Sequence, residues 1–144
     1  MKTSKIDIEI VRMDNDYNIH LIIKANIKKR NIRLLIDTGA THSCIAKHIA
    51  DDMAALETED VDKLLNLNEE ITDIEQKKMI KIPRLQVGDF YINNYFYLIT
   101  DLTHINMMYE NMDIQPIDGL LGSDILLKYN ALIDYSRAMM IWQK

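Results

Sequence analysis

The fold of this chain is decided by residues 34–40, which read Leu-Leu-Ile-Asp-Thr-Gly-Ala. The aliphatic run 34–36 is typical of a buried strand that is too short to be a helix. Asp37 follows at once, so the strand delivers a carboxylate to its end, where burial and neighbouring charges can shift the pKa. Gly39 predicts a tight turn, because glycine tolerates the positive φ that such corners often need. Taken alone, the triplet favours a plain turn in which Asp caps the loop.

A second stretch later in the sequence changes this interpretation. Residues 117–126 read Ile-Asp-Gly-Leu-Leu-Gly-Ser-Asp-Ile-Leu, and residues 129–135 read Tyr-Asn-Ala-Leu-Ile-Asp-Tyr. Together with residues 34–40 they resemble the retropepsin-like aspartic proteases, a single-domain family that includes the retroviral enzymes. That family pairs an aliphatic-Asp-Thr-Gly-Ala stretch with a later aliphatic-aliphatic-Gly that leads into a short helix. The match looks closest to the cellular and bacterial members and covers about residues 17–142.

The resemblance implies a fold and a site. The expected fold is mainly all-β: a retropepsin-like acid-protease barrel with one or two short helices and one Asp-Thr-Gly triplet per chain. The implied site residues are Asp37 as the catalytic group, Thr38 and Gly39 as supports of the active-site loop, Ala40, Thr41 and His42 as substrate contacts, and Leu120, Leu121 and Gly122 as a companion strand beneath the loop. No metal, cofactor or covalent intermediate is implied.

Length and composition set further limits. A chain of 144 residues predicts one domain, 1–144, which buries about two thirds of its unfolded surface. The net charge of -5 argues against a nucleic-acid partner, which would need a basic face. Cys44 is the single cysteine and is expected to be a small core residue. The start of the sequence has no signal-peptide pattern, and no stretch reaches the ~20 apolar residues that span a bilayer. The expectation is a cytoplasmic protein with no membrane partner.

The middle of the chain matches the family least. Residues 51–75 hold ten Asp or Glu and one Lys, which predicts an acidic helical insertion at about 51–70. A solvated face is the favoured interpretation of this charge, and selection of basic substrates or partners is the alternative. Residues 71–83 should form the flap that retropepsins fold over substrate. Their lack of glycine, unlike the glycine-rich retroviral flaps, puts turnover and specificity in question.

Local patterns predict the remaining elements. Alternating apolar residues predict strands from Ile6, from Tyr17 and at 32–36, and Gly88-Asp89 predicts a hairpin between 80–87 and 90–99. Apolar spacing predicts a helix over 45–56, and a second helix over 125–129 would be capped by Ser123 or Asp124. Residues 107–115 are expected to be a loop or helical turn. Three histidines are expected to have no chemical role. His20 is expected at the surface, His48 on a solvated helix face and His104 in a loop.

Peptide hydrolysis by carboxylates needs two of them, one to take a proton from water and one to protonate the carbonyl oxygen. The chain has one Asp-Thr-Gly, since Asp118-Gly119 lacks the threonine. The predicted function is therefore an aspartic endopeptidase that acts as a homodimer on peptide or protein substrates, with a C-terminal strand that includes Trp142 at the interface. The alternative is a catalytically weak or inactive dimer that binds peptides or partner proteins. This binding alternative is supported by the lack of glycine in the flap region. It is also supported by Ser123-Asp124, which stand where the retroviral enzymes have Gly-Arg-Asn. A structural subunit with Asp37 as a turn former is the third possibility.

Overall fold

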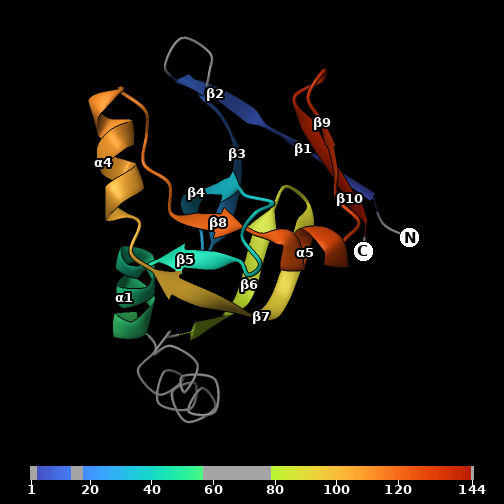
Figure 1. Cartoon of the computed structure of the whole chain (residues 1–144). Coiled ribbons are helices and arrows are strands. Elements are labelled where there is room, and N and C mark those ends of the chain that lie inside the picture. Colours follow the sequence, from blue (N-terminus) through green and yellow to red (C-terminus); the bar gives the residue numbers. More distant parts are fainter. Residues whose placement is uncertain (1–2, 14–17, 57–78, 144) are drawn as a thin grey trace.

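The computed structural model describes residues 3–13, 18–56 and 79–143, and most of them lie in strands. In chain order the elements are β1 (Thr3–Asp7), β2 (Glu9–Met13), β3 (Asn18–Ile27), β4 (Arg30–Ile36), β5 (Cys44–Ala46), α1 (Lys47–Leu56), β6 (Met79–Val87), β7 (Phe90–Thr100), α4 (Thr103–Asn111), β8 (Gly119–Leu121), α5 (Ser123–Lys128), β9 (Leu132–Asp134) and β10 (Met139–Gln143) (Figure 1). None of the described helices has the length and apolar character needed to cross a membrane.

The larger sheet closes on itself as a barrel. Its strand order is β2-β3-β4-β8-β5-β7-β6, and β3 also pairs with β6, where Asn26 lies opposite Gln86. The strand pairs β4–β8 and β5–β7 are parallel, and the other pairs are antiparallel. The predicted mainly-β barrel is therefore confirmed. The described residues contain three helices, α1, α4 and α5, of which the sequence predicted α1 and α5.

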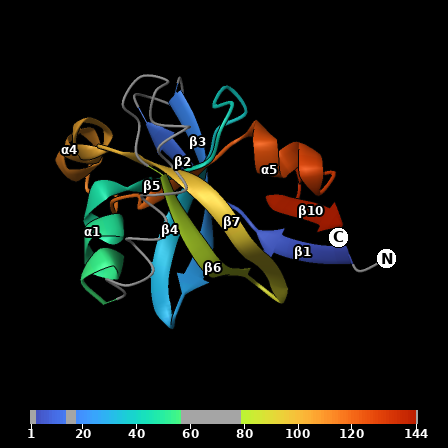
Figure 2. The same ribbon diagram turned by 90° about the horizontal axis from the view of Figure 1, so that it is seen from below.

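Two hairpins of the barrel follow directly from local sequence. Lys28 and Lys29 have φ values of 49° and 68°, the left-handed pair that suits the twist of a two-residue hairpin between β3 and β4. Gly88 has a φ of 62° and joins β6 to β7, which lie side by side in Figure 2. Apolar residues alternate along β6, and Ile82, among others, is fully buried. The prediction of a hairpin at Gly88-Asp89 is confirmed.

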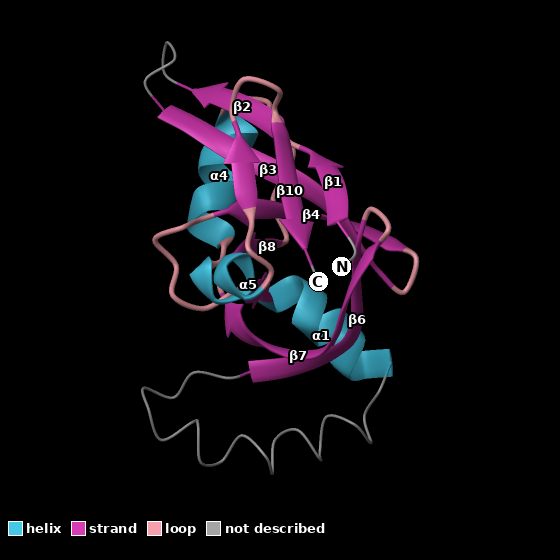
Figure 3. Cartoon of the chain, turned by 90° about the vertical axis from the view of Figure 1, so that its right-hand side faces the viewer, coloured by secondary structure: helices cyan, strands magenta, loops and turns pink. Residues whose placement is uncertain are grey.

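A smaller sheet forms beside the barrel from the two ends of the described chain. Its order is β1-β10-β9, with Thr3 opposite Gln143 and Asp7 opposite Met139. Figure 3 shows β1 and β10 side by side. The ring of Trp142 on β10 is fully buried and packs on Phe90, with the ring centroids 4.8 Å apart. The ring of Trp142 thus packs in the core of its own chain.

Helices α1 and α4 lie together on one side of the barrel (Figures 1 and 2). The sequence predicted α1 but started it at Ile45, which instead lies in the short strand β5. Residues 107–115 were expected to be a loop or helical turn and His104 a loop residue, but His104 and residues 107–111 belong to α4, whose fully buried side chain is Tyr109. Of the acidic insertion, 57–70 lie outside the described residues. Of the flap region, 71–78 lie outside them and 79–83 belong to β6.

Candidate active site

The backbone around Asp37 is fixed by its neighbours. The carboxylate follows β4, which runs parallel to β8 with Ile36 opposite Leu121. The Asp37 N–H donates to the Leu121 carbonyl oxygen at 3.0 Å, and the Asp37 carbonyl accepts from the Ala40 N–H at 3.1 Å. The Gly39 N–H donates to Asp37 Oδ1 at 3.0 Å. Asp37 itself remains half-buried, so its carboxylate is held in place while still in contact with solvent.

The glycines of the site act by allowing close approach. The backbone of Gly39 is not left-handed, so the expected positive φ was wrong; an added Cβ would instead lie 3.3 Å from Asp37 Oδ1. At Gly122 an added Cβ would lie 2.7 Å from the Ala40 carbonyl oxygen, inside van der Waals contact. The next residue uses this proximity, because the Ser123 N–H and Oγ–H both donate to the Ala40 carbonyl, at 2.8 Å and 3.1 Å. Gly122 and Ser123 therefore pack closely against the turn at residues 37–40.

Asp124 ties three segments together beneath this loop. Its Oδ1 accepts from the Ser43 N–H at 3.0 Å and the Ser43 hydroxyl at 2.8 Å, and its Oδ2 accepts from the Tyr95 hydroxyl at 2.6 Å. The hydroxyl oxygen of Ser43, Oγ, in turn accepts from the Gly122 N–H at 2.8 Å. The prediction that Ser123 or Asp124 caps the helix was wrong: Gly122 occupies the N-cap of α5 and makes no side-chain cap.

Electrostatics reinforce the Asp124 cluster. The Asp124 side chain is 14% exposed. Burial acts to raise its pKa, but the hydrogen bonds from Tyr95 and Ser43 outweigh burial and hold the pKa below its ordinary value. The pKa of Tyr95 lies well above its ordinary value, first because of burial and then because its hydroxyl donates to this carboxylate. At neutral pH the pair is therefore an ionised acceptor and a neutral donor.

The other expected substrate contacts lie along the same loop. Thr38 and Thr41 are exposed, and Ala40 and His42 are half-buried. His42 is engaged within its own chain: Nε2 lies 3.1 Å from the Phe96 carbonyl oxygen, where it can donate, and the ring stacks on Tyr95 at a centroid distance of 6.1 Å. The loop thus presents backbone and small side chains to solvent and leans on β7 through His42.

A small cavity of about 290 Å³ opens beside Asp37. Its lining is aliphatic and aromatic apart from Asp37, Thr38 and His20: Ile19, Leu21, Leu35, Ile36, Ile133 and Tyr135 complete it. His20 was predicted to be surface, which is wrong, because Tyr109 of α4 covers it and the Tyr109 hydroxyl contacts His20 Nδ1. Burial lowers the pKa of His20, and the nearby Asp37 opposes that shift. The sequence did not predict α4, so it could not predict that His20 is partly covered by Tyr109.

The site offers carboxylate chemistry. Within the described part of the chain no three His, Cys, Asp or Glu side chains are grouped to hold a metal ion. A half-buried carboxylate on a hydrogen-bonded turn, next to a cavity with both polar and apolar lining, can take a proton from water or give one to a carbonyl oxygen. One such carboxylate performs one of these two roles at a time.

Comparison with known proteins agrees with this geometry. A family model described as "Aspartyl protease" matches residues 23–125. Several solved structures share the fold, among them the following two. A retropepsin-like aspartic protease from Rickettsia conorii is 18% identical, with a TM-score of 0.54 and coverage of 98% of this chain and 90% of that one. The retroviral protease-like domain of Ddi1 from Leishmania major is 17% identical, with a TM-score of 0.52 and coverage of 81% and 82%. No curated protein matches the sequence. The chain belongs to the aspartyl protease family and has the fold of its retropepsin-like members.

Proposed function

We propose that this protein is an aspartic endopeptidase that acts as a homodimer, in which each chain supplies one Asp37 of the catalytic pair. The observation that carries the proposal is the position of Asp37, held by the Leu121 carbonyl and the Gly39 N–H at the edge of an open cavity. A two-fold axis near this turn would bring two copies of the carboxylate face to face, because a two-fold interface meets itself.

The proposed mechanism is the one common to aspartic proteases. Two carboxylates in contact cannot both ionise, so the pair holds a single proton. The ionised Asp37 takes a proton from a water molecule as its oxygen attacks the peptide carbonyl carbon, and the protonated Asp37 donates to the carbonyl oxygen. The tetrahedral diol then collapses: the C–N bond breaks, the amine nitrogen receives a proton, and an acid and an amine leave.

The expected substrate is an extended peptide with apolar side chains beside the cut. Strand-like hydrogen bonds to the exposed backbone around Gly39 would hold its main chain. The aliphatic lining beside Asp37, including Leu35 and Ile133, would take an apolar side chain. Thr38 is the proposed link between the two active-site loops, and Ala40, Thr41 and His42 are the proposed wall of the cleft.

The first test is cleavage of a diverse peptide pool, read by mass spectrometry between about pH 4 and 7. Wild type, Asp37→Asn and the exposed control Asp52→Asn would be compared. The amide introduced by Asp37→Asn keeps an oxygen that can accept from the Gly39 N–H, so the turn should survive while proton transfer is lost. Cuts made by wild type and Asp52→Asn but not by Asp37→Asn would support the proposal, and cuts by all three would refute it.

A second test addresses the shared site. Wild type and Asp37→Asn are mixed in equal amounts and allowed to exchange subunits. If each site needs two Asp37 side chains, activity falls to roughly a quarter of that of the same total amount of wild type, because only one dimer in four is fully intact. A fall to one half would place a complete site in each chain. A folded dimer that cuts nothing would favour the alternative of a peptide-binding dimer.

A further inference from the structure

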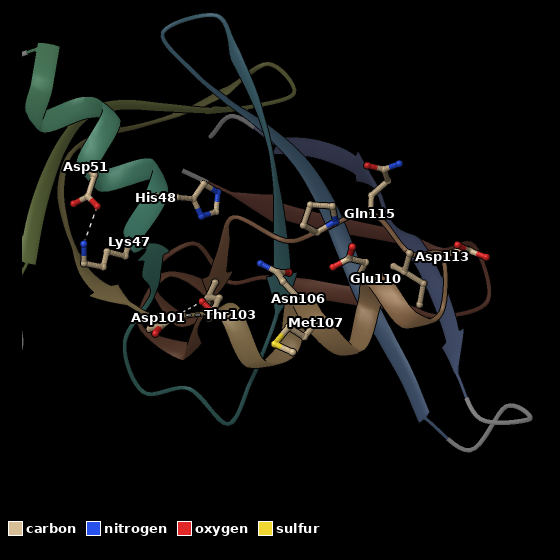
Figure 4. Close-up of a pocket in the computed structure, with 13 residues that line it drawn as sticks. Lys47, His48, Asp51, Asp101, Thr103, Asn106, Met107, Glu110, Asp113 and Gln115 are labelled. Atoms are coloured by element: carbon tan, nitrogen blue, oxygen red, sulfur yellow. Dashed lines mark hydrogen bonds and ion pairs between the residues drawn. The ribbon is translucent and has the colours of Figure 1, made fainter.

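A second, larger hollow lies away from the Asp37 cavity, between α1 and α4. Its volume is about 840 Å³, within the range of sites that bind ligands. Figure 4 shows Lys47, His48 and Asp51 on α1 facing the groove from one side, with Met107 and Glu110 of α4 on the other. Residues 113–116 close one end. We call this hollow the α1–α4 groove.

The walls of the α1–α4 groove are held in place by hydrogen bonds. The side chain of Asn106 donates from Nδ2 to the Ile117 carbonyl at 3.0 Å and accepts at Oδ1 from the Ile117 N–H at 2.8 Å. His48 Nε2 lies 3.0 Å from Asp118 Oδ1. Both helices are thus fastened to the segment that leads into β8, so the groove exists before any ligand arrives.

The α1–α4 groove is acidic at its edges. Four carboxylates line it: Asp51, Asp101, Glu110 and Asp113. Lys47 is the one lysine or arginine in the lining, and it is paired with Asp51 at 2.8 Å. Hydrogen bonds from Thr103 keep the pKa of Asp101 below its ordinary value. The side chains of Glu110 and Asp113 make no ion pair or hydrogen bond with another described residue.

The α1–α4 groove also has apolar surface between these charges. Leu102, Ile114 and Pro116 contribute to the lining, and Met107 is 58% exposed there. An exposed, flexible methionine is suited to contact side chains of varied shape. A ligand that matches both features would carry positive charges spaced around an apolar side chain.

We propose that the α1–α4 groove is a docking site for a short basic segment, containing Arg or Lys and an apolar residue, of the protein substrate. The proposal rests on the protease function proposed above. Charge complementarity selects this occupant. The segment of this chain that follows α1 is a poor candidate, since residues 57–78 contain eight Asp or Glu and three Lys.

Helix α4 lines the α1–α4 groove and also contacts a residue that lines the Asp37 cavity. Met107 and Glu110 of α4 line the groove, while Tyr109, between them in sequence, contacts His20 at the edge of the Asp37 cavity. A substrate held in the cleft could therefore place a distant basic segment on the opposite face of α4. Such docking would strengthen binding without touching the reacting atoms.

The test measures binding separately from hydrolysis. The Asp37→Asn protein is titrated against a fluorescein-labelled peptide of about eight residues that carries Arg and Leu, and against the same peptide with Glu in place of Arg, by fluorescence anisotropy. Adding Glu110→Gln and Asp113→Asn should weaken binding of the Arg peptide roughly fivefold to tenfold, since each lost charge pair weakens binding severalfold. The matched control, Asp7→Asn with Asp52→Asn, removes two exposed carboxylates outside the groove and should leave affinity unchanged.

A further variant and a kinetic assay make the outcome decisive. Met107→Lys, at an exposed helical position, should abolish binding of the Arg peptide without loss of fold. With otherwise wild-type protein, Glu110→Gln/Asp113→Asn should raise KM fivefold to tenfold for substrates with a basic tail, at unchanged kcat, and leave tail-free substrates unaffected. Equal weakening by the control pair, or equal binding of the Glu peptide, would overturn the proposal. Groove-dependent binding without any Asp37-dependent cleavage would refute the protease function and leave the docking site standing.

Discussion

Replacement of Asp124 should reveal how strongly the Ser43–Asp124–Tyr95 cluster supports the active-site loop. The carboxylate accepts three hydrogen bonds at 2.6–3.0 Å and is 14% exposed. Loss of a buried charged acceptor leaves its donors unpaired, so Asp124→Ala should lower the free energy of unfolding by about 3–5 kcal/mol. That corresponds to a fall in Tm of about 10–15 °C for a chain of this size. Asp124→Asn keeps the shape but not the charge and should cost about 2 kcal/mol.

The assay is urea unfolding followed by circular dichroism at one fixed protein concentration, because the stability of the proposed dimer would depend on concentration. Asp52→Ala is the control: this carboxylate is 59% exposed and pairs with Arg30 at 2.6 Å, so its loss should cost under about 1 kcal/mol.

The effect should also depend on pH. The pKa of folded Asp124 is below the ordinary value of 3.8, so its stabilisation is complete above about pH 4 and is lost as pH falls through the folded-state pKa. The gap between wild type and Asp124→Asn should therefore narrow in acid. An Asp124→Ala protein within about 1 kcal/mol of wild type, or a gap that stays constant into strong acid, would refute the reasoning.

Two further changes test the surroundings of Asp37. Burial holds the pKa of His20 below 6.5, so in mild acid the unfolded chain binds a proton that the folded chain does not. Wild type should therefore lose stability as pH falls below about 6.5. The His20→Gln variant should lose less stability over the same range, as measured by urea unfolding at about pH 7.5 and 5. Identical dependence of stability on pH in wild type and His20→Gln would contradict this prediction. Gly122→Ala would place a Cβ 2.7 Å from the Ala40 carbonyl oxygen. It should lower the free energy of unfolding by about 1–3 kcal/mol and reduce peptide cleavage. Unchanged thermal unfolding and unchanged cleavage would show that the loop can move aside.

The parts of the structure that the sequence predicted well are those coded by neighbouring residues. The strand before Asp37, the turn at Gly88-Asp89 and the short strand before Gly122 each carry a local signal: an apolar run, a turn pair, or glycine at a close approach. Helix α4 carries none, because Met107 and Met108 are exposed and the apolar spacing that marks a helix against a core is missing.

The errors within the site come from contacts between distant parts of the chain. His20 was expected to face solvent because the helix that covers it was not predicted. Asp124 was expected to cap a helix because Asp is favoured at helix N-termini and the neighbouring sequence carries no other signal. Its real partners, Ser43 and Tyr95, lie 81 and 29 residues away in the chain, a relation that no single-sequence pattern encodes.

The pairing of β4 with β8 has a consequence for the order in which this protein folds. The contact between Ser123 and Ala40 joins residues 83 positions apart, and closing a loop of that length costs about 4 kcal/mol of chain entropy before any contact repays it. The β3–β4 and β6–β7 hairpins are local and should form first, whereas the turn at Asp37 acquires its final shape when β8 arrives. During synthesis, residues 34–40 leave the ribosome long before residues 119–123. A nascent chain would therefore carry an unformed site, and the proposed hydrolytic activity would appear only as the barrel closes.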